Sequence, residues 1–360
     1  MGLPIGAAPV DAAFTKSLPK AELHAHLSGS ISVQTLHQIW QLKRSRGECL
    51  SLNDPALALR PAGSYPTVST FFQIFNDYIY TLVNDEESLS YATRSVVQDF
   101  ARDGVKYLEL RTTPRAVGFG GKREYVGQVL EALKWNWEVL PEGDMEVQLI
   151  LSIDRGMTAE EAMDVVEIAL QHRSVRCKET EPHVVGIDLC GNPTKGDVQV
   201  FTPAFRKGKE AGLGITVHFA EVPASSSEEE LRTLLDWQPD RLGHAIHISS
   251  ALKEIIREKK IGLELCLSCN VLAKLTEGGF WQHHFGEWRH SGCPIALGTD
   301  DVGVFESTLS NEYFIAASEF SMERKEIMGL ARKAVDGAFT GRERMMGLLD
   351  AFEKEMVQHQ

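Results

Sequence analysis

Eight short apolar segments, separated for the most part by stretches with helical signals, constrain the fold more than any other feature of this sequence. Each segment is rich in Val, Ile and Leu, which is typical of strands that are buried on both faces. The segments are Ala21–Leu27, Tyr107–Thr113, Val147–Asp154, Val184–Cys190, Ile215–Ala220, Arg241–Ile246, Ile261–Leu267 and Pro294–Asp300. Strands that alternate with helices predict a parallel sheet, and eight such units predict a closed (β/α)8 barrel.

Local signals support the helices between these segments. Thr158-x-x-Glu161 is a capping box ahead of an apolar helical pattern, and the serines of 225–227 precede three glutamates that suit the first turn of a helix. Helical spacing also joins four residues that we expect to form a core or lid face: Phe71, Phe75, Tyr78 and Leu82. A doubly wound sheet is the alternative, weakened by the absence of G-x-G-x-x-G after the first strand.

The length of 360 residues fits either two domains or one barrel with insertions. We expect a single domain over residues 1–360, because no repeat or interdomain linker interrupts the pattern. Residues 45–68 contain several Gly and Pro and predict a loop inserted after the first helix. From about Ser307 the pattern is helical, which predicts a C-terminal helical extension.

Composition excludes several classes of partner. The net charge of -13 argues against nucleic acid, because phosphate backbones select basic surfaces. The N-terminus lacks the basic start and apolar core of a signal peptide, and no apolar run approaches 18 residues. The six cysteines do not form the dense framework of a small secreted domain. We therefore expect a cytoplasmic protein, a monomer, with a small-molecule substrate and no membrane or nucleic-acid partner.

Metal-ligand and acid/base residues gather where the predicted strands end. His24 and His26 stand one residue apart at the end of the first strand, and neighbours at i and i+2 point to the same face. Two such imidazoles can hold one metal ion, and zinc is the first expectation for nitrogen ligands. Other strand ends carry Arg111 and Arg115, Asp188 to Gly191, His218 and Glu221, His244, and Asp300 and Asp301. In a barrel these ends share one face, so the sequence predicts a metal site there.

Each of these residues also has a plainer explanation. A histidine at a strand end can be a satisfied core residue, and Asp300 and Asp301 can cap the next helix. Arg111 and Arg115 can form salt bridges at the rim instead of contacting a ligand. Cys266-x-x-Cys269 has no second cysteine pair, so we interpret it as structural.

The strand-end motifs resemble those of the adenosine deaminase family of metal-dependent hydrolases. They read S-L-P-K-A-E-L-H-A-H-L-S-G-S-I, H-F-A-E, R-L-G-H-A and A-L-G-T-D-D, and the similarity extends from about Leu18 to the C-terminal helices. Further segments, among them D-G-V-K-Y-L-E-L-R-T-T-P-R, I-D-L-C-G-N-P-T, L-E-L-C-L-S-C-N-V and Q-H-H-F-G, resemble the adenosine deaminase-like subgroup, which acts on N6-methyl-AMP. The resemblance implies a hydrolytic deaminase with one zinc ion per chain.

The resemblance also implies roles for individual residues. Four side chains would bind the zinc, which lowers the pKa of its water: His24, His26, His218 and Asp300. Glu221 would pass a proton to a purine ring nitrogen, and His244 would orient the activated water. The residues implied in substrate binding are His26, Ser28, Arg111, Arg115, Gly191 and Asp301.

Ser28 bears on which purine is the substrate. Adenosine deaminases usually carry Asp at this position and the methyl-AMP subgroup usually carries Asn, so Ser departs from both. A neutral hydroxyl can donate to a 5′-phosphate that an anionic side chain would repel, and Arg111 and Arg115 could add cationic donors. We therefore expect conversion of N6-methyl-AMP to IMP and methylamine, with deamination of free adenosine as the alternative. A different hydrolase on this barrel and a silent binding protein stay open.

Overall fold

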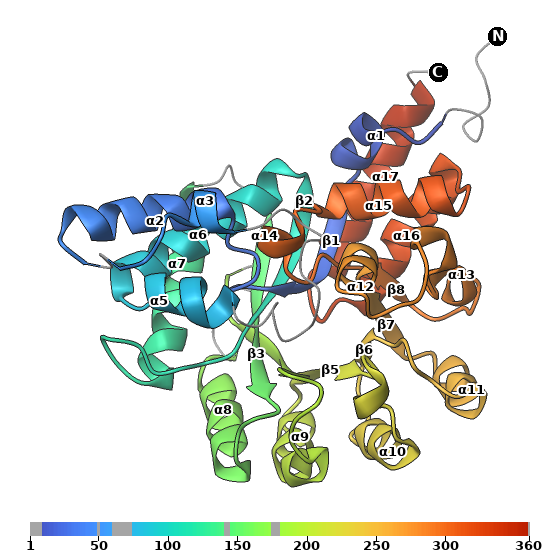
Figure 1. Cartoon of the computed structure of the whole chain (residues 1–360). Helices are drawn as coiled ribbons and strands as arrows, with labels where there is room; N and C mark the ends of the chain where they lie inside the picture. Colours follow the sequence, from blue (N-terminus) through green and yellow to red (C-terminus); the bar gives the residue numbers. More distant parts are fainter. Residues whose placement is uncertain (1–8, 49–50, 60–73, 140–144, 174–180, 359–360) are drawn as a thin grey trace.

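The computed structural model describes residues 9–48, 51–59, 74–139, 145–173 and 181–358, and it contains a parallel sheet of eight strands in the order β1 to β8. The strands are β1 (Lys20–His26), β2 (Val105–Thr112), β3 (Glu146–Asp154), β4 (Val184–Cys190), β5 (Gly214–Phe219), β6 (Arg241–His244), β7 (Gly262–Leu265) and β8 (Ile295–Leu297). Each predicted strand overlaps one of these. The predicted (β/α)8 barrel is therefore confirmed, and helices surround it (Figure 1).

The barrel closes between β1 and the segment that follows β8. The Asp300 N–H donates to the His24 carbonyl over 2.7 Å, and the His26 N–H donates to the Asp300 carbonyl over 2.9 Å. The backbone bonds that close the sheet thus place two residues near the start of the chain beside one near its end. Three of the four predicted metal ligands are neighbours for this reason.

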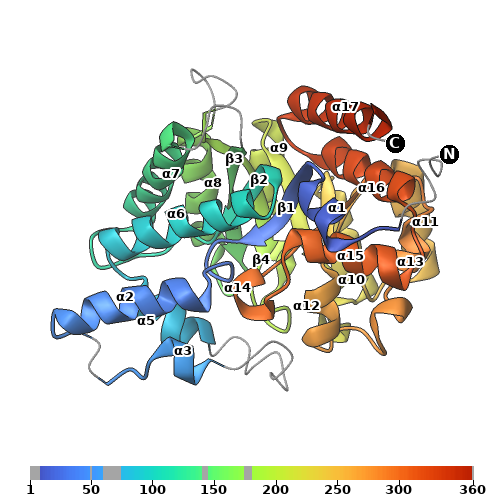
Figure 2. The ribbon, with the colours of Figure 1, turned by 90° about the horizontal axis from the view of Figure 1, so that it is seen from above.

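Helices cover the outside of the sheet, as the views from the side and from above show (Figures 1 and 2). The longer ones are α2 (Val33–Ser45), α6 (Glu86–Arg102), α7 (Lys122–Val139), α8 (Ala159–Gln171), α9 (Thr202–Glu210), α10 (Glu228–Asp236), α11 (Ser250–Lys259), α15 (Leu309–Glu319), α16 (Arg324–Gly337) and α17 (Arg342–Gln358). The shorter ones are α1 (Ala12–Ser17), α3 (Pro55–Ala58), α5 (Tyr80–Leu82), α12 (Leu267–Leu272), α13 (Phe285–Trp288) and α14 (Val302–Phe305). Among the described helices, none has the length and apolar character of a membrane span.

The predicted helix starts are confirmed. The Thr158 hydroxyl accepts from the Glu161 N–H over 3.2 Å, and the Glu161 carboxylate accepts in return from the Thr158 N–H over 2.9 Å. Helix α10 begins after Ser227, whose hydroxyl accepts from the Glu230 N–H over 3.2 Å. The predicted C-terminal extension is α15 to α17.

The predicted insertion at 45–68 is only partly described. Helix α2 ends at Ser45, the short helix α3 follows, and residues 49–50 and 60–68 lie outside the described part of the chain. Phe71 of the predicted core or lid face also lies outside it. Phe75 and Tyr78 are in a π-helical turn, η1 (Phe75–Ile79), and Leu82 is fully buried in α5.

The barrel interior holds a central ion cluster of Glu109, Arg111, Asp188, Arg241 and Glu264, all essentially without solvent exposure. The Glu264 carboxylate on β7 accepts from Arg111 over 2.8 Å and from Arg241 over 2.5 Å. Arg111 also lies 3.3 Å from Asp188, and Arg241 lies 2.6 Å from Glu109. Burial opposes the charge on Glu264, but the two guanidinium groups hold its pKa well below the usual range. Glu264 therefore stays ionised beneath the strand ends.

Phe339, in the segment between α16 and α17, packs across the amino-terminal end of the barrel. A Cβ added to Gly186 or Gly214 would lie 2.7 Å or 2.6 Å from its ring, so both strands need glycine there. The guanidinium carbon of Arg241 lies 3.7 Å from the centre of the same ring. Phe339 thus closes the lower end of the central ion cluster.

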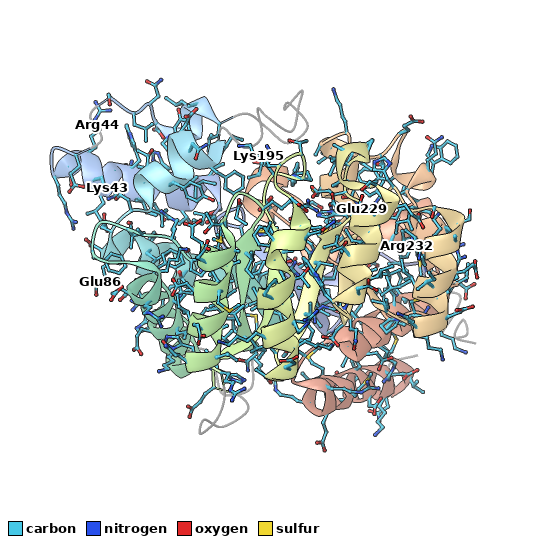
Figure 3. All side chains as sticks on the ribbon, turned by 90° about the horizontal axis from the view of Figure 1, so that it is seen from below. Lys43, Arg44, Glu86, Lys195, Glu229 and Arg232 are labelled. Atoms are coloured by element: carbon cyan, nitrogen blue, oxygen red, sulfur yellow. The ribbon has the colours of Figure 1, made fainter. Side chains whose placement is uncertain are left out.

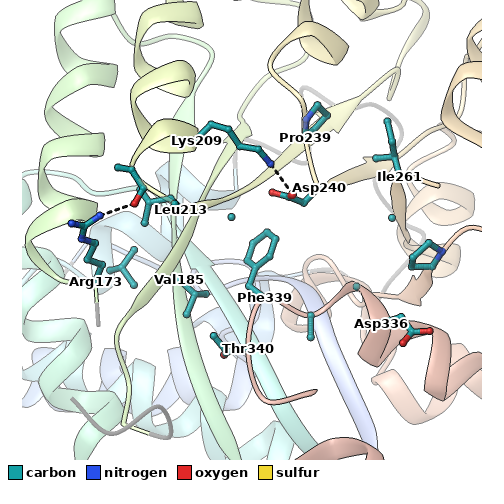
Figure 4. Close-up of a pocket in the computed structure, with 18 of the residues that line it drawn as sticks. Arg173, Val185, Lys209, Leu213, Pro239, Asp240, Ile261, Asp336, Phe339 and Thr340 are labelled. Atoms are coloured by element: carbon teal, nitrogen blue, oxygen red, sulfur yellow. Dashed lines mark hydrogen bonds and ion pairs between the residues drawn. The ribbon is translucent and has the colours of Figure 1, made fainter. Parts of the chain in front are cut away.

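A cavity of about 970 Å³, the amino-terminal cavity, lies beside Phe339 (Figure 4). Two of its charged groups are engaged with protein partners: Lys209 lies 2.8 Å from the Asp240 carboxylate, and Arg173 donates to the Ala211 carbonyl over 2.6 Å. The described lining contains no cluster of metal-ligating side chains.

Candidate active site

A second cavity, of about 330 Å³, opens at the carboxyl-terminal end of the barrel, and we call it the site cavity. Most predicted site residues line it: His26, Ser28, Arg111, Gly191, His218, Glu221, His244, Asp300 and Asp301. His24 is fully buried next to them, whereas Arg115 is not among the lining residues. The barrel thus brings together residues from the ends of six strands.

Several of these side chains could hold one metal ion. Among the described residues, the ligand atoms of one group lie within 4.8 Å of one another: His24, His218, His244 and Asp300. His26, the fourth predicted ligand, borders the same centre. Its Nε2 lies 3.1 Å from the Nε2 of His218 and 3.3 Å from the Oδ1 of Asp300. Five candidate donors therefore surround a space that suits four protein ligands and a water.

Two of the imidazoles, those of His24 and His218, are oriented by hydrogen bonds from their Nδ1 atoms. The Nδ1 of His24 donates to Glu264 over 2.6 Å, and the Nδ1 of His218 donates to the Leu189 carbonyl over 2.8 Å. Each ring then carries its proton on Nδ1 and turns the Nε2 lone pair toward the shared centre, as in metal sites with oriented ligands. The Nε2 of His24 is buried and has no hydrogen-bond partner among the described residues. An orphaned nitrogen aimed into a nitrogen-rich donor set fits a metal such as zinc.

Adjacent carboxyl groups are given opposite character by their surroundings. Burial opposes ionisation of Asp300, but the nearby imidazoles, His24 first among them with its Nε2 3.5 Å from the Asp300 Oδ1, keep the pKa of Asp300 well below the usual range. Burial and the neighbouring Asp300 charge raise the pKa of Asp301 well above the usual range. Asp301 packs over Gly29, where an added Cβ would lie 1.5 Å from its Oδ1. Asp300 can therefore bind a metal as an anionic carboxylate, and Asp301 can donate a hydrogen bond as a neutral carboxyl group.

Backbone strain gathers at the same rim. Ala220, His244, Ala245 and Asp300 all have left-handed φ values between 52° and 62°, which cost non-glycine residues free energy. They lie at or just past the ends of β5, β6 and β8. This backbone directs Glu221, His244 and Asp300 into the site cavity, and such strain is typical of functional sites.

The loop after β4 presents an exposed cation. Gly191 has a φ of +95°, and a Cβ there would lie 2.2 Å from an Asp154 oxygen, so the tight turn needs glycine. The Asn192 Oδ1 then accepts from the Thr194 N–H over 3.0 Å. This turn carries Lys195, which is labelled in Figure 3, into the lining of the site cavity, where it makes no ion pair with the described residues.

The structure does not support the predicted phosphate contacts of Arg111 and Arg115. Arg111 belongs to the central ion cluster, where two buried carboxylates already neutralise it, so its salt bridges lie inside the barrel and not at the rim. Arg115 donates to the Val83 carbonyl over 2.6 Å and lies over the Tyr80 ring at 4.6 Å. Strand-end position alone could not reveal these partners, because they come from distant segments.

One side of the site cavity is apolar. Four residues form this side, which we call the apolar wall: Cys269, Ala273, Leu275 and Phe305. Burial, with the nearby Asp300 charge, raises the pKa of the Cys269 thiol well above the usual range, so it packs as a neutral group. Cys266 and Cys269 are both free and buried, which agrees with the structural interpretation of this motif.

Sequence reasoning missed Glu264, Asn270 and Lys195. A signal existed for Glu264, because an acidic residue inside the apolar run L-E-L needs a buried partner. Lys195 follows the I-D-L-C-G-N-P-T segment by one residue, but nothing in its sequence context distinguishes it from other surface lysines.

Comparison with known proteins agrees with this geometry. The family model described as adenosine deaminase matches residues 19–355. The chain belongs to the adenosine deaminase family. Its relatives include the N6-methyl-AMP deaminase of Danio rerio, 37% identical over 335 residues, which are 91% of this chain and 92% of that protein. The N6-mAMP deaminase of Arabidopsis thaliana is 35% identical over 96% of this chain and 99% of its own.

A solved structure of the adenosine deaminase family extends the comparison to three dimensions. The crystal structure of Arabidopsis ADAL complexed with IMP superposes with a TM-score of 0.82 and 34% identity, covering 96% of this chain and 99% of that chain. The predicted family is therefore confirmed, and the match spans the barrel and the C-terminal helices.

Proposed function

We propose that this protein is a zinc-dependent hydrolase that removes the amine substituent from purine nucleoside monophosphates, with N6-methyl-AMP as its preferred substrate. One observation carries the proposal: a metal-ligand cluster, an acid/base residue, an apolar wall and an unpaired cation share one small cavity. The relatives named N6-methyl-AMP deaminase and the IMP complex of Arabidopsis ADAL support it. The products are IMP and methylamine.

One zinc per chain would be held by His24, His26, His218 and Asp300. Three imidazoles and a carboxylate are a donor set that zinc prefers over Mg²⁺ or Ca²⁺. When bound, zinc lowers the pKa of a coordinated water toward about 7, which supplies a nucleophile at neutral pH. The chain's own residues then position the purine and move its protons.

Glu221 gives a proton to a purine ring nitrogen, which makes the adjacent carbon more electrophilic. The neutral Asp301 carboxyl donates to the purine edge, and the Gly191 N–H donates to another ring nitrogen. Overall, the oxygen of water bonds to the carbon that carries the amine, and the bond from that carbon to nitrogen breaks. One water proton stays on the ring and the other leaves with methylamine.

Lys195 is the group that recognises the 5′-phosphate. The described lining of the site cavity contains two cationic side chains, and Arg111 is neutralised by the central ion cluster. Lys195 is exposed at the mouth, where a mobile phosphate can reach it. Ser28 lines the same cavity and adds a neutral hydroxyl that does not repel the anion.

The apolar wall favours a methylated amine over a free one. It borders the same cavity as Glu221, His244 and Asp300, so the departing nitrogen lies in its neighbourhood. A methyl group loses contact with water there, whereas a primary amine would leave a polar N–H without a partner.

The experiment compares kcat/KM for N6-methyl-AMP, AMP and adenosine, with release of methylamine or ammonia as the readout. We expect N6-methyl-AMP to be best and adenosine to be worst. A clear preference for adenosine would reject the nucleotide assignment in favour of a nucleoside deaminase. Absence of amine release from all three would favour a different hydrolase or a binding protein.

A further inference from the structure

Two buried residues, Asn270 and His283, lie on the Nδ1 side of the His244 ring. The Nδ1 of His244 lies 3.0 Å from the side-chain amide of Asn270, and that amide lies 3.0 Å from the Nε2 of His283. The backbone N–H of Phe285 donates to the Nδ1 of His283 over 3.0 Å. All three side chains are essentially inaccessible to solvent, so water cannot replace any of these partners.

The position of each proton in this chain of contacts follows from the His283 end. Burial lowers the pKa of His283, so its ring is neutral and carries one ring proton. The Phe285 N–H cannot rotate away, which makes the Nδ1 of His283 an acceptor. The single proton of His283 is therefore on Nε2, and that nitrogen donates toward Asn270.

The side-chain amide of Asn270 must accept this hydrogen bond from His283 through its oxygen. The structure places the amide nitrogen toward His283, which would set two donors face to face. A half-turn of the amide leaves its shape unchanged and satisfies both contacts. The nitrogen then donates to the Nδ1 of His244, which forces the His244 proton onto Nε2.

We infer that Asn270 and His283 are positioning residues that fix His244 in its Nε2–H tautomer. This Nε2 is buried, has no partner among the described residues and lies 3.9 Å from the Oδ2 of Asp300. A protonated Nε2 cannot ligate a metal. His244 is thus separated from the other candidate ligands, which are the four of the proposed zinc site.

The tautomer gives His244 a defined task in the reaction, a task that rests on the proposed function. Its Nε2–H donates a hydrogen bond to the oxygen that attacks the purine, and donors of this kind act where negative charge develops. The opposite tautomer would present a lone pair, which can accept a hydrogen bond but cannot donate one to this oxygen.

Nitrogen-15 NMR of the zinc-loaded full chain with labelled histidine tests the tautomer without substrate. We expect His244, assigned by its loss in His244→Gln, to show a protonated Nε2 and an unprotonated Nδ1. The reverse pattern would overturn the inference even if the substrate assignment holds, and the expected pattern can stand even if that assignment fails.

Variants give a second readout. Asn270→Asp can only accept, so it should move the His244 proton to Nδ1 and lower kcat for N6-methyl-AMP by about 10²–10³-fold, the usual effect of losing one such donor, with KM changed little. His283→Gln keeps one donor and one acceptor and should retain most of the activity, whereas His283→Leu should not.

His284→Gln is the matched control. The Nε2 of His284 donates to the His244 carbonyl over 2.6 Å, so it contacts the same residue but not its ring. We expect an unchanged tautomer and kcat in this variant. An unchanged kcat and tautomer in folded Asn270→Asp would overturn the inference, and if that variant does not fold, the wild-type spectrum decides.

Discussion

The two ends of the barrel are both hollow, yet they differ in what their charged groups do. The amino-terminal cavity is the larger, at about 970 Å³ against about 330 Å³ for the site cavity. Its charged groups include a paired lysine and a guanidinium bonded to a backbone carbonyl. In and next to the site cavity, buried nitrogens of His24 and His244 and an oxygen of Asp301 have no hydrogen-bond partner among the described residues. Unsatisfied buried polar groups that converge, rather than volume, mark the functional end.

Glu221→Gln should give the largest effect and show that the site cavity serves activity and not stability. Loss of the group that transfers the proton should lower kcat by roughly 10²–10⁴-fold, because general acid–base catalysis contributes about that much. Zinc content and thermal stability should stay near wild type, since Glu221 is not among the proposed ligands. Metal analysis with steady-state kinetics checks this, and near-normal turnover would remove Glu221 from the mechanism.

Phe339→Ala, at the amino-terminal end of the barrel, should lower stability and leave activity nearly unchanged. The partly exposed ring packs on Gly186, Gly214 and Arg241, so its loss should lower the free energy of unfolding by about 2–4 kcal/mol. We expect kcat of the folded protein to stay within a few-fold of wild type. Denaturant unfolding and kinetics measure the two effects, and a large loss of kcat at full folding would show that the ends are coupled.

Lys195→Met tests whether the unpaired cation binds phosphate. We expect kcat/KM to fall about ten-fold for N6-methyl-AMP and AMP, equal to about 1.4 kcal/mol, and to stay unchanged for adenosine. Lys209→Met at the amino-terminal cavity is the matched control and should affect none of the three substrates. Equal losses for adenosine and the nucleotides would assign Lys195 a structural role.

Leu275→Ala should give the smallest effect, and it tests whether the apolar wall is a subsite for the substituent on the amine. Enlarging the wall should raise kcat/KM for N6-ethyl-AMP relative to N6-methyl-AMP by several-fold, since each added methylene is worth about 0.8 kcal/mol when buried. Leu272→Ala removes a residue of the same apolar cluster that does not line the site cavity. A similar shift in both variants would point to general loosening instead of a subsite.

The sequence predicted the barrel well because its strands are encoded locally. Apolar runs such as Val184–Cys190 and the capping box at Thr158 and Glu161 are short-range patterns, and they appear in the structure at the predicted places. The convergence of His24, His26 and Asp300 also followed from a rule of the fold, since all lie at strand ends.

What the sequence could not reveal depends on partners far apart in the chain. Arg111 at a strand end suggested a ligand contact, but Glu264 and Asp188 on other strands neutralise it. Burial and strand direction put the Arg111 guanidinium inside the barrel, and neither is visible in the local pattern. Asn270 and His283 act on His244 from outside the strand ends, so position along the strands gave no signal for them.

The most direct test of the metal-dependent mechanism is amine release before and after removal of the metal. We expect purified protein to contain about one zinc per chain, to lose methylamine release from N6-methyl-AMP after chelation, and to recover it on adding zinc back. Full activity in thoroughly stripped protein would contradict the account.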